Sequence, residues 1–438
     1  MNKVRTRALS VYLLIAVAVL GMGFYVVRFI IHGDDWASAP FNVAVYSRGS
    51  LAVGRVTDRN GVILADVTDG RRTFAESRDV RRATLHAVGD KEGNIGTGAL
   101  TAFAPEMMGY NLITGSYSRS ARGRTIALTI DSWLNVEALH ALDGRRGVVM
   151  VSNYMTGEVL CMVSSPTFDP GDPPGEPEEG VYMNRAIQSA YTPGSTFKLV
   201  TAAAAIDNIG DVYERVFNCT GELETGNGRI TCNSVHGSIG FEEGLRVSCN
   251  VVFGQLALDL GADIIAEYAK DFGLSGRTEV GGISSAKGNF DKAPPNSTDL
   301  AWSGVGQFNN TVCPASMLRF VGAIANEGNA VELRLLKDRG VSSLIPVKSE
   351  RILSWNTAIR LGDIMEIQNR QNFPGLEIHA KSGTAQLGGG KDPHAWYVGY
   401  ITNEDYPLAF VVIVENGGGG SAVAGPVASR VLQAAINS

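Results

Sequence analysis

Cysteine is scarce in this sequence, with five residues among 438. The five are scattered along the chain without the short ligand spacings typical of a zinc site, so we expect no metal ion. Cys219 and Cys232 flank a glycine-rich segment and could form a disulfide outside the cytoplasm. Because five is an odd number, at least one thiol must stay free. Cys161 lies in an apolar run and is expected to be an ordinary core residue.

An excess of positive charge is also missing. Charged residues make up 19% of the chain, and the formal net charge at pH 7 is -6. A chain that binds nucleic acid usually carries basic patches that neutralise phosphates, so we expect no nucleic-acid partner. The hydrophobic content of 45% fits a globular protein, and the length of 438 residues predicts two or three domains.

Residues 8–27 contain no charged side chain, and Lys3, Arg5 and Arg7 precede them. An apolar run of this length can span a bilayer as a helix, and its basic flank favours a cytoplasmic N-terminus. We therefore expect a cytoplasmic tail at 1–7 and a transmembrane helix at 8–31. A cleaved signal peptide is the alternative, because residues 37–39 (ASA) resemble a cleavage site. The apolar run is longer than a typical signal peptide needs, and that site lies well beyond it.

Residues 32–124 lack both a long periodic helix and a recognisable catalytic motif. Residues 56–64 alternate like two strands around an Asn60-Gly61 turn. This region is expected to be a small module, α+β or mostly β, with its charged side chains in solvent.

A second domain is predicted from 125 to 438. Asp131 is placed to cap a helix over 133–142, and two strands follow at 147–152 and 158–165. Late strands at 377–386, 395–401 and 408–414 precede a helix at 426–435. Early and late strands with a largely helical region at 202–306 between them predict an α+β fold, in which one antiparallel sheet is packed by helices.

Ser195 lies where a Pro-Gly turn runs into an alanine-rich helix. Capping the helix is the ordinary role for a serine there. Lys198 is three residues further on, so its amine can reach the serine hydroxyl and activate it as a nucleophile if burial or a second cation keeps the amine neutral. The same spacing recurs at Ser284 and Lys287, but glycines on both sides indicate a loop.

Two further short patterns are candidates for the same site. Ser248 and Asn250 precede an apolar helix; they can cap it, or they can project a hydroxyl and a carboxamide together into a cleft. Ser354 and Asn356 share this spacing, and there capping is the better explanation. Lys381-Ser382-Gly383 lies in a predicted strand, where a lysine is often just an exposed edge residue. Gly383 in mid-strand suggests that another segment approaches the backbone closely.

Taken together, the three patterns resemble the penicillin-interacting serine enzymes, in which an SxxK helix, an SxN turn and a K-[ST]-G strand occur in this order. More specific segments are similar to class B penicillin-binding proteins, the monofunctional peptidoglycan D,D-transpeptidases. These segments are residues 129–131 (TID), 157–160 (GEVL), 165–170 (SPTFDP), 184–186 (NRA), 193–198 (PGSTFK) and 394–399 (HAWYVG). Residues 58–61 (DRNG) resemble the pedestal pattern of the family, and the short pedestal is most like the compact penicillin-binding-protein-A type.

The resemblance implies a transpeptidase domain at 125–438 behind a pedestal at 32–124. It implies that Ser195, Lys198 and Ser248 are catalytic and that Asn250 holds a substrate amide. Lys381 and the hydroxyls of Ser382 and Thr384 would bind a terminal carboxylate, with Gly383 between them. Ser382 stands where many members have threonine, and Cys249 fills the variable middle of the SxN pattern.

The substrates implied are stem peptides that end in D-Ala-D-Ala, and β-lactams would acylate Ser195. No metal or organic cofactor is needed, and a membrane-embedded SEDS-type lipid II polymerase is the partner that the family suggests. A β-lactamase is disfavoured because we find no E-x-x-L-N-like segment after Asn250. A bifunctional class A penicillin-binding protein is disfavoured as well, because it would need a glycosyltransferase domain before the transpeptidase, and residues 32–124 are too few for one. A β-lactam sensor or scaffold and a D,D-carboxypeptidase stay open as alternatives.

Overall fold

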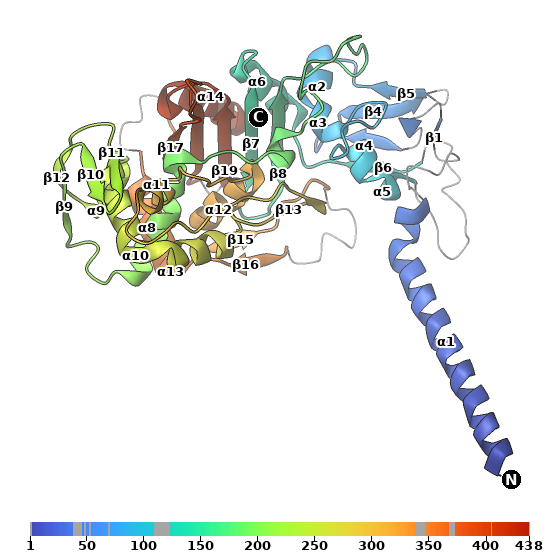
Figure 1. Ribbon diagram of the computed structural model, residues 1–438. Coiled ribbons are helices and arrows are strands. Elements are labelled where there is room, and N and C mark those ends of the chain that lie inside the picture. The colour runs from blue at the N-terminus through green and yellow to red at the C-terminus, as the bar shows by residue number, and fades with distance from the viewer. Residues whose placement is uncertain are drawn as a thin grey trace.

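The computed structural model describes residues 2–37, 46–47, 50–51, 54–68, 71–108, 123–337, 347–367, 373–403 and 405–437. Helix α1 (Asn2–Ala37) extends away from the rest of the chain (Figure 1). Within these residues, α1 is the one helix long and apolar enough to cross a membrane, over Arg7–Phe29. The helix expected at 8–31 is therefore present, and the direction in which it would cross a membrane stays a prediction. Residues 38–39 of the alternative cleavage site lie outside the described residues.

A five-stranded antiparallel sheet forms the centre of the molecule, in the order β17-β18-β19-β7-β8. Its strands are β7 (Gly147–Asn153), β8 (Val159–Ser165), β17 (Ile378–Ala385), β18 (His394–Ile401) and β19 (Leu408–Val414). The early hairpin and the late three-stranded meander expected from the sequence thus join side by side through β19 and β7. The predicted α+β fold is confirmed.

Helices cover both faces of this sheet, because alternate residues of its strands are apolar on each side. In β7, Val149 belongs to the cluster that includes side chains of α6 (Ser132–Leu142) and α14 (Gly425–Asn437). Val148 belongs to the cluster on the opposite face. A strand buried on both faces is nearly continuously apolar, which explains the sequence GVVMVSN of β7.

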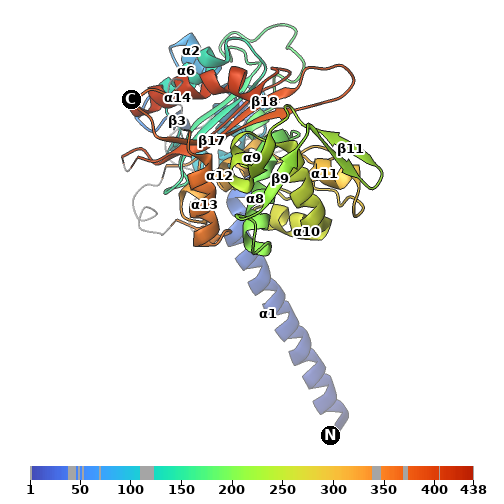
Figure 2. The same ribbon diagram turned by 90° about the vertical axis from the view of Figure 1, so that its left-hand side faces the viewer.

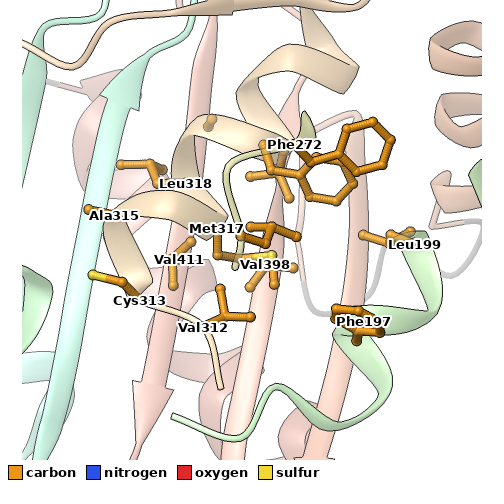
Figure 3. Close-up of a cluster of buried hydrophobic side chains, with 14 of the residues drawn as sticks. Phe197, Leu199, Phe272, Val312, Cys313, Ala315, Met317, Leu318, Val398 and Val411 are labelled. Atoms are coloured by element: carbon orange, nitrogen blue, oxygen red, sulfur yellow. The ribbon is translucent and has the colours of Figure 1, made fainter. Parts of the chain in front are cut away.

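The face of the sheet that carries Val148 packs against a helical region. Its helices are α8 (Lys198–Asn208), α9 (Phe241–Arg246), α10 (Asn250–Asp271), α11 (Thr298–Gly304), α12 (Pro314–Ala325) and α13 (Trp355–Met365). Figure 3 shows Phe197 and Leu199 in the same buried cluster as Met317 of α12 and Val398 of β18. The two residues that flank Lys198 therefore anchor the start of α8 in the core.

Short helices and strands complete this domain. They are α7 (Arg185–Gln188), the 3-10 turn η1 (Gly194–Phe197), β9 (Val216–Cys219), β10 (Glu222–Thr225), β11 (Gly228–Thr231), β12 (Gly237–Gly240), β13 (Glu279–Val280), β14 (Ile283–Ser284), β15 (Asn329–Val331), β16 (Ser349–Arg351) and the π-turn η4 (Gly420–Ala424). β10 pairs with β11, and β9 pairs with β12. Figure 2 shows β9 and β11 beside α9 and α10.

The N-terminal module is built on a second sheet, in the order β5-β4-β3-β6. Its elements are β1 (Tyr46–Ser47), β2 (Ser50–Leu51), β3 (Arg55–Thr57), β4 (Ile63–Thr68), β5 (Arg71–Phe74), α2 (Arg78–Ala83), α3 (Leu85–Val88), α4 (Ala99–Ala102), α5 (Ala104–Met108) and β6 (Thr125–Ala127). The hairpin expected over 56–64 is confirmed as β3 and β4.

The predicted domain border falls inside this second sheet. β6, which begins at the first residue assigned to the second domain, pairs in parallel with β3. Arg81 of α2 also forms an ion pair with Asp169 beyond β8, with 2.6 Å between Arg81 Nε and Asp169 Oδ1. The two parts of the chain thus share a strand and an ion pair, and the division at 124 and 125 stays a prediction.

Candidate active site

The chain around Ser195 is held tightly on both sides. Ser195 lies inside η1, directly before α8, and the N-cap residue of η1 is Pro193. Gly194 has a φ of 55°, which a glycine adopts without strain, and its N–H donates to the carbonyl of Gly306 over 2.9 Å. The ordinary capping role of Ser195 is therefore replaced by a contact of its hydroxyl with Lys198.

Lys198 is fully buried, and its amine lies at the centre of the site. Its Nζ is 3.1 Å from Ser195 Oγ and 3.1 Å from Ser248 Oγ. It also donates to the carbonyl of Ser248 over 2.7 Å and to Asn250 Oδ1 over 2.8 Å. One amine therefore joins three of the residues that the sequence singled out, although they come from two separate segments.

The surroundings of Lys198 lower the pKa of its amine and so favour the neutral form that can act as a base. Burial is the main cause that lowers the pKa of Lys198 well below its ordinary value, and the charge of Lys381 is the second cause. Cys232 and Cys249 act in the opposite direction, more weakly. A buried lysine with a lowered pKa has a larger neutral fraction near pH 7, and only the neutral amine can accept a proton.

Ser248 and Asn250 belong to a tight turn that opens α10. Ser248 has a φ of 58°, which is unusual for a residue other than glycine. The N-cap residue of α10 is Cys249, so the capping alternative for Ser248 and Asn250 does not hold. Asn250 Nδ2 donates to the carbonyl of Thr231 over 2.9 Å, which fixes the carboxamide so that its oxygen faces Lys198.

A second lysine, Lys381, contacts the same serine hydroxyl. It is buried on edge strand β17, and its Nζ donates to Ser248 Oγ over 3.0 Å and to its neighbour's carbonyl, Ser382 O, over 2.9 Å. Burial lowers the pKa of Lys381 to about 8. Ser248 Oγ thus lies between two lysine amines, which is the arrangement of a hydroxyl that can relay a proton.

The side chains of β17 divide between its two faces. Ser382 and Thr384 are two residues apart and so lie on one face, opposite to Lys381 and Gly383. Thr384 is exposed, and its Oγ1 accepts from the backbone N–H of Gly420 over 3.3 Å. These two hydroxyls can donate hydrogen bonds to a carboxylate, and the cationic amine of the neighbouring residue Lys381 can attract it through its charge.

Gly383 is the point where β17 contacts the Ser195 turn. A β-carbon at Gly383 would lie 2.8 Å from the carbonyl oxygen of Pro193 and 2.9 Å from Cγ2 of Thr196. Both distances are too short for a carbon atom, so only glycine fits without a shift. The close approach that the sequence suggested at Gly383 is confirmed, and it sets the distance between the strand and the serine.

The eight residues predicted for the site divide into one connected group and one adjoining row. Ser195, Lys198, Ser248, Asn250 and Lys381 are joined by hydrogen bonds. Ser382, Gly383 and Thr384 follow Lys381 along β17, next to η1. By contrast, Ser284 and Lys287 are both exposed and lie outside any helix, as expected. Ser284 ends the short strand β14, where the sequence predicted a loop. Ser354 caps α13 by accepting from the N–H of Thr357 over 3.1 Å, also as expected.

The structure brings together one group of side chains that sequence spacing missed. The sulfur atoms of Cys219, Cys232 and Cys249 and a ring nitrogen of His236 lie within 4.8 Å of one another, directly behind the Ser248 turn. All of the cysteines carry free thiols, so Cys219 and Cys232 do not form the disulfide that the sequence allowed. The scattered spacing concealed this group, because β10, β11, β12 and α9 separate its members along the chain.

A serine with a buried lysine base, next to a hydroxyl that bridges two lysines, defines a serine acyltransferase or hydrolase type of site. The chain belongs to the penicillin-binding protein transpeptidase family, whose domain model matches residues 147–433. With its small N-terminal module, it is a class B penicillin-binding protein.

Relatives of known activity and structure agree with this assignment. The chain is 27% identical over 368 residues to the peptidoglycan D,D-transpeptidase PbpA of Mycobacterium tuberculosis, covering 73% of this chain and 74% of that protein. The crystal structure of that organism's penicillin-binding protein A superposes with a TM-score of 0.77 at 26% identity, covering 89% of this chain and all of the other. Its penicillin G acyl-enzyme complex superposes with a TM-score of 0.76 at 25% identity.

Proposed function

We propose that this protein is a peptidoglycan D,D-transpeptidase that cross-links stem peptides through an acyl-enzyme on Ser195. The observation that carries the proposal is the position of the Lys198 amine, which is buried and lies 3.1 Å from both Ser195 Oγ and Ser248 Oγ. A general base in direct contact with a nucleophile and with a second hydroxyl serves both halves of an acyl transfer.

In the first half, neutral Lys198 takes the proton of Ser195, and Ser195 Oγ attacks the carbonyl carbon of the penultimate D-alanine. The backbone N–H groups of Ser195 and Thr384 stabilise the negative oxygen that forms, because Gly383 lets β17 approach η1 closely. Such donors typically contribute about 3 kcal/mol of transition-state stabilisation each.

Collapse of the tetrahedral intermediate then releases the terminal D-alanine. Ser248 donates its proton to the departing amine and is reprotonated from Lys198, which lies 3.1 Å away. Lys381, Ser382 and Thr384 hold the carboxylate of that D-alanine, and Asn250 holds an amide of the donor peptide. The hydrogen bonds of Lys198 and Lys381 to Ser248 Oγ support the relay role of that hydroxyl.

In the second half, an amine of a neighbouring stem peptide attacks the acyl-enzyme and Lys198 accepts its proton. The bond between the acyl carbon and Ser195 Oγ breaks, and Lys198 returns the proton to Ser195 Oγ, 3.1 Å away. β-Lactams acylate Ser195 in the same way, since their ring carbonyl takes the place of the D-alanyl carbonyl. The chemistry requires no organic cofactor. We further propose that α1 anchors the protein with its N-terminus in the cytoplasm and its catalytic domain outside, and that a SEDS-type polymerase supplies the glycan strands.

A D,D-carboxypeptidase and a β-lactam sensor are the competing functions, and they differ in what removes the acyl group. The test incubates the detergent-solubilised full chain with a pentapeptide donor ending in D-Ala-D-Ala and an excess of a D-amino acid as acceptor. We expect mass spectrometry to detect the exchanged peptide in excess over the hydrolysed tetrapeptide, and neither product with Ser195→Ala. Hydrolysis alone would replace the proposal by a carboxypeptidase, and a stable adduct without turnover would replace it by a sensor.

A further inference from the structure

The thiols and the imidazole behind the active-site turn come from four different elements. Cys219 ends β9, Cys232 directly follows β11, His236 precedes β12, and Cys249 is the N-cap residue of α10. Cys219 and Cys249 are fully buried, whereas Cys232 and His236 are half-buried. The antiparallel pairing of β9 with β12 and of β10 with β11 brings these elements to one point.

Three distances within this group match those between neighbouring ligands of a tetrahedral metal centre. Zinc bonds of about 2.3 Å to sulfur and about 2.0 to 2.1 Å to nitrogen place two sulfur ligands about 3.8 Å apart and a sulfur and a nitrogen about 3.5 to 3.6 Å apart. The structure has 3.8 Å between Cys232 Sγ and Cys249 Sγ. It has 3.5 Å from Cys219 Sγ to His236 Nδ1 and 3.6 Å from Cys232 Sγ to the same nitrogen.

A second observation points to a charged sulfur ligand. The backbone N–H of Asn250 donates to Cys232 Sγ over 3.2 Å. Backbone donors of this kind commonly support the thiolate ligands of a metal. A disulfide would use two of the three thiols and would leave the third thiol and the imidazole next to it without a role. Ordinary core packing explains a buried cysteine, but it does not explain three sulfurs converging on one ring nitrogen.

We propose that Cys219, Cys232, His236 and Cys249 bind one Zn²⁺ ion in a closed structural site. Three thiolates and a neutral imidazole are a ligand set that zinc prefers, and four protein ligands leave no open position for catalysis. The metal binding is independent of the activity proposed above.

The position of Cys249 gives the metal a positioning role. Cys249 lies between Ser248 and Asn250, so a bond from its sulfur to zinc ties the active-site turn to β9 and to the segment between β11 and β12. Ser248 has its unusual φ of 58° in this turn. The zinc ion therefore holds Ser248 Oγ between Lys198 and Lys381. This consequence, unlike the metal site itself, rests on the proposed function.

Metal analysis of the wild-type protein is the first test and requires no variant. The full chain, purified in detergent without an affinity tag that binds metal, is expected to contain one equivalent of zinc by inductively coupled plasma mass spectrometry. Replacement of zinc by Co²⁺ is expected to give the intense visible bands of tetrahedral cobalt with thiolate ligands. A protein that holds neither metal after incubation with ZnCl₂ or CoCl₂ under reducing conditions would overturn the proposal.

Variants then assign the ligands. Cys219→Ser and Cys232→Ser are expected to lose the metal, whereas Cys161→Ala and Cys313→Ala, which change buried thiols outside the group, are expected to keep it. A native disulfide between any two of the three cysteines, found by peptide mapping of protein purified without reductant and persisting when zinc is supplied to the reduced protein, would also overturn the site.

The positioning role has its own readout. Removal of zinc with a chelator is expected to slow acylation of Ser195 by a fluorescent penicillin by about 10- to 100-fold, because a misplaced catalytic group costs this much, and to leave the far-ultraviolet circular dichroism largely unchanged. Re-addition of ZnCl₂ should restore the rate. A protein that binds zinc but is never acylated would support the metal site while contradicting the proposed function. Equal acylation rates with and without zinc would overturn the positioning role.

Discussion

The chain contains two Ser-x-x-Lys segments, and they lie in opposite surroundings. Ser195 and Lys198 are at the junction of a 3-10 turn and an α-helix, where Lys198 is fully buried and in contact with the serine. Ser284 and Lys287 are exposed and belong to a two-residue strand and the loop after it. The comparison teaches that this spacing brings the serine and the amine into contact only where a helix aligns the side chains, and that burial there lowers the pKa of the amine.

The two Ser-x-Asn segments show the same contrast. Ser248 has a positive φ and lies between two lysine amines, whereas Ser354 caps α13. One serine is held in a conformation that is rare for its residue type, and the other is in a common one. Substituting one residue of each compared pair, Lys198 against Lys287 and Ser248 against Ser354, can therefore separate catalytic from structural roles.

The largest effect is expected from Lys198→Met, which keeps the length of the side chain and removes the base. Loss of a general base typically costs about 10²- to 10⁴-fold in rate, so acylation of Ser195 by a fluorescent penicillin should slow by about 10³-fold. Lys287→Met should leave the rate unchanged. Stopped-flow acylation kinetics compare the two variants, with thermal unfolding as a check on folding. A wild-type rate in Lys198→Met would refute the assigned base.

The second largest effect concerns the two serines. Ser248→Ala should slow acylation by about 10²-fold, because it removes the proton relay to the leaving group. Ser354→Ala should keep the wild-type rate but lower the free energy of unfolding by about 1 kcal/mol, since it removes a helix cap. Acylation rates and denaturant unfolding curves measure the two quantities. If both variants lose stability and neither loses rate, Ser248 is structural.

A smaller effect is expected where β17 contacts the Ser195 turn. Gly383→Ala places a carbon 2.8 Å from the carbonyl oxygen of Pro193, so the strand must move away from η1. We expect acylation about tenfold slower and a loss of stability of about 1 to 3 kcal/mol, as overpacking typically gives. Gly276→Ala is the matched control, because its β-carbon would have open space. Equal stability of the two variants would show that β17 tolerates the shift.

The smallest effect is a change in pH dependence. Lys381→Gln removes the charge that is the second cause of the lowered pKa of Lys198, so that pKa should rise. A base works in its neutral form, and the rising acid limb of the acylation profile should therefore move to higher pH. In the wild type, carboxylate binding should weaken above about pH 8 as Lys381, with a pKa of about 8, loses its charge, so the profile should fall on its alkaline side.

The control variant Lys287→Gln should change neither the acid side nor the alkaline side of the profile. If the acid side stays in place in Lys381→Gln, the charges of the two lysines are not coupled.

Much of this fold could be predicted from the sequence because its main elements have local signals. The cap at Asp131, the hairpin over β7 and β8 and the turn before α8 were all recognised from short patterns. The sequence does not predict that β6 belongs to the N-terminal sheet, because its pairing with β3 joins strands far apart in the chain. A short β-rich run indicates a strand but does not specify its partner.

The side chains of the site also divide into those that local patterns predict and those that only strand pairing brings together. The three motifs located the residues that the amines of Lys198 and Lys381 hydrogen-bond, because each motif combines a residue type with a local conformation. The group formed by Cys219, Cys232, His236 and Cys249 has one close spacing, between Cys232 and His236. The β10-β11 hairpin separates the first two cysteines, and β12 and α9 separate the histidine from the last cysteine. Only the pairing of β9 with β12 and of β10 with β11 brings these ligands together. Sequence spacing alone therefore predicted no metal where the fold assembles four ligands.

The central claim is that Ser195 is a nucleophile activated by Lys198. The most direct measurement is the mass of the full chain over time after mixing with a penicillin, followed by peptide mapping, for the wild type, Ser195→Ala and Lys198→Met. The account predicts a persistent adduct on Ser195 in the wild type, none in Ser195→Ala, and strongly delayed formation in Lys198→Met. An adduct on a different residue, or none in the wild type, would contradict it.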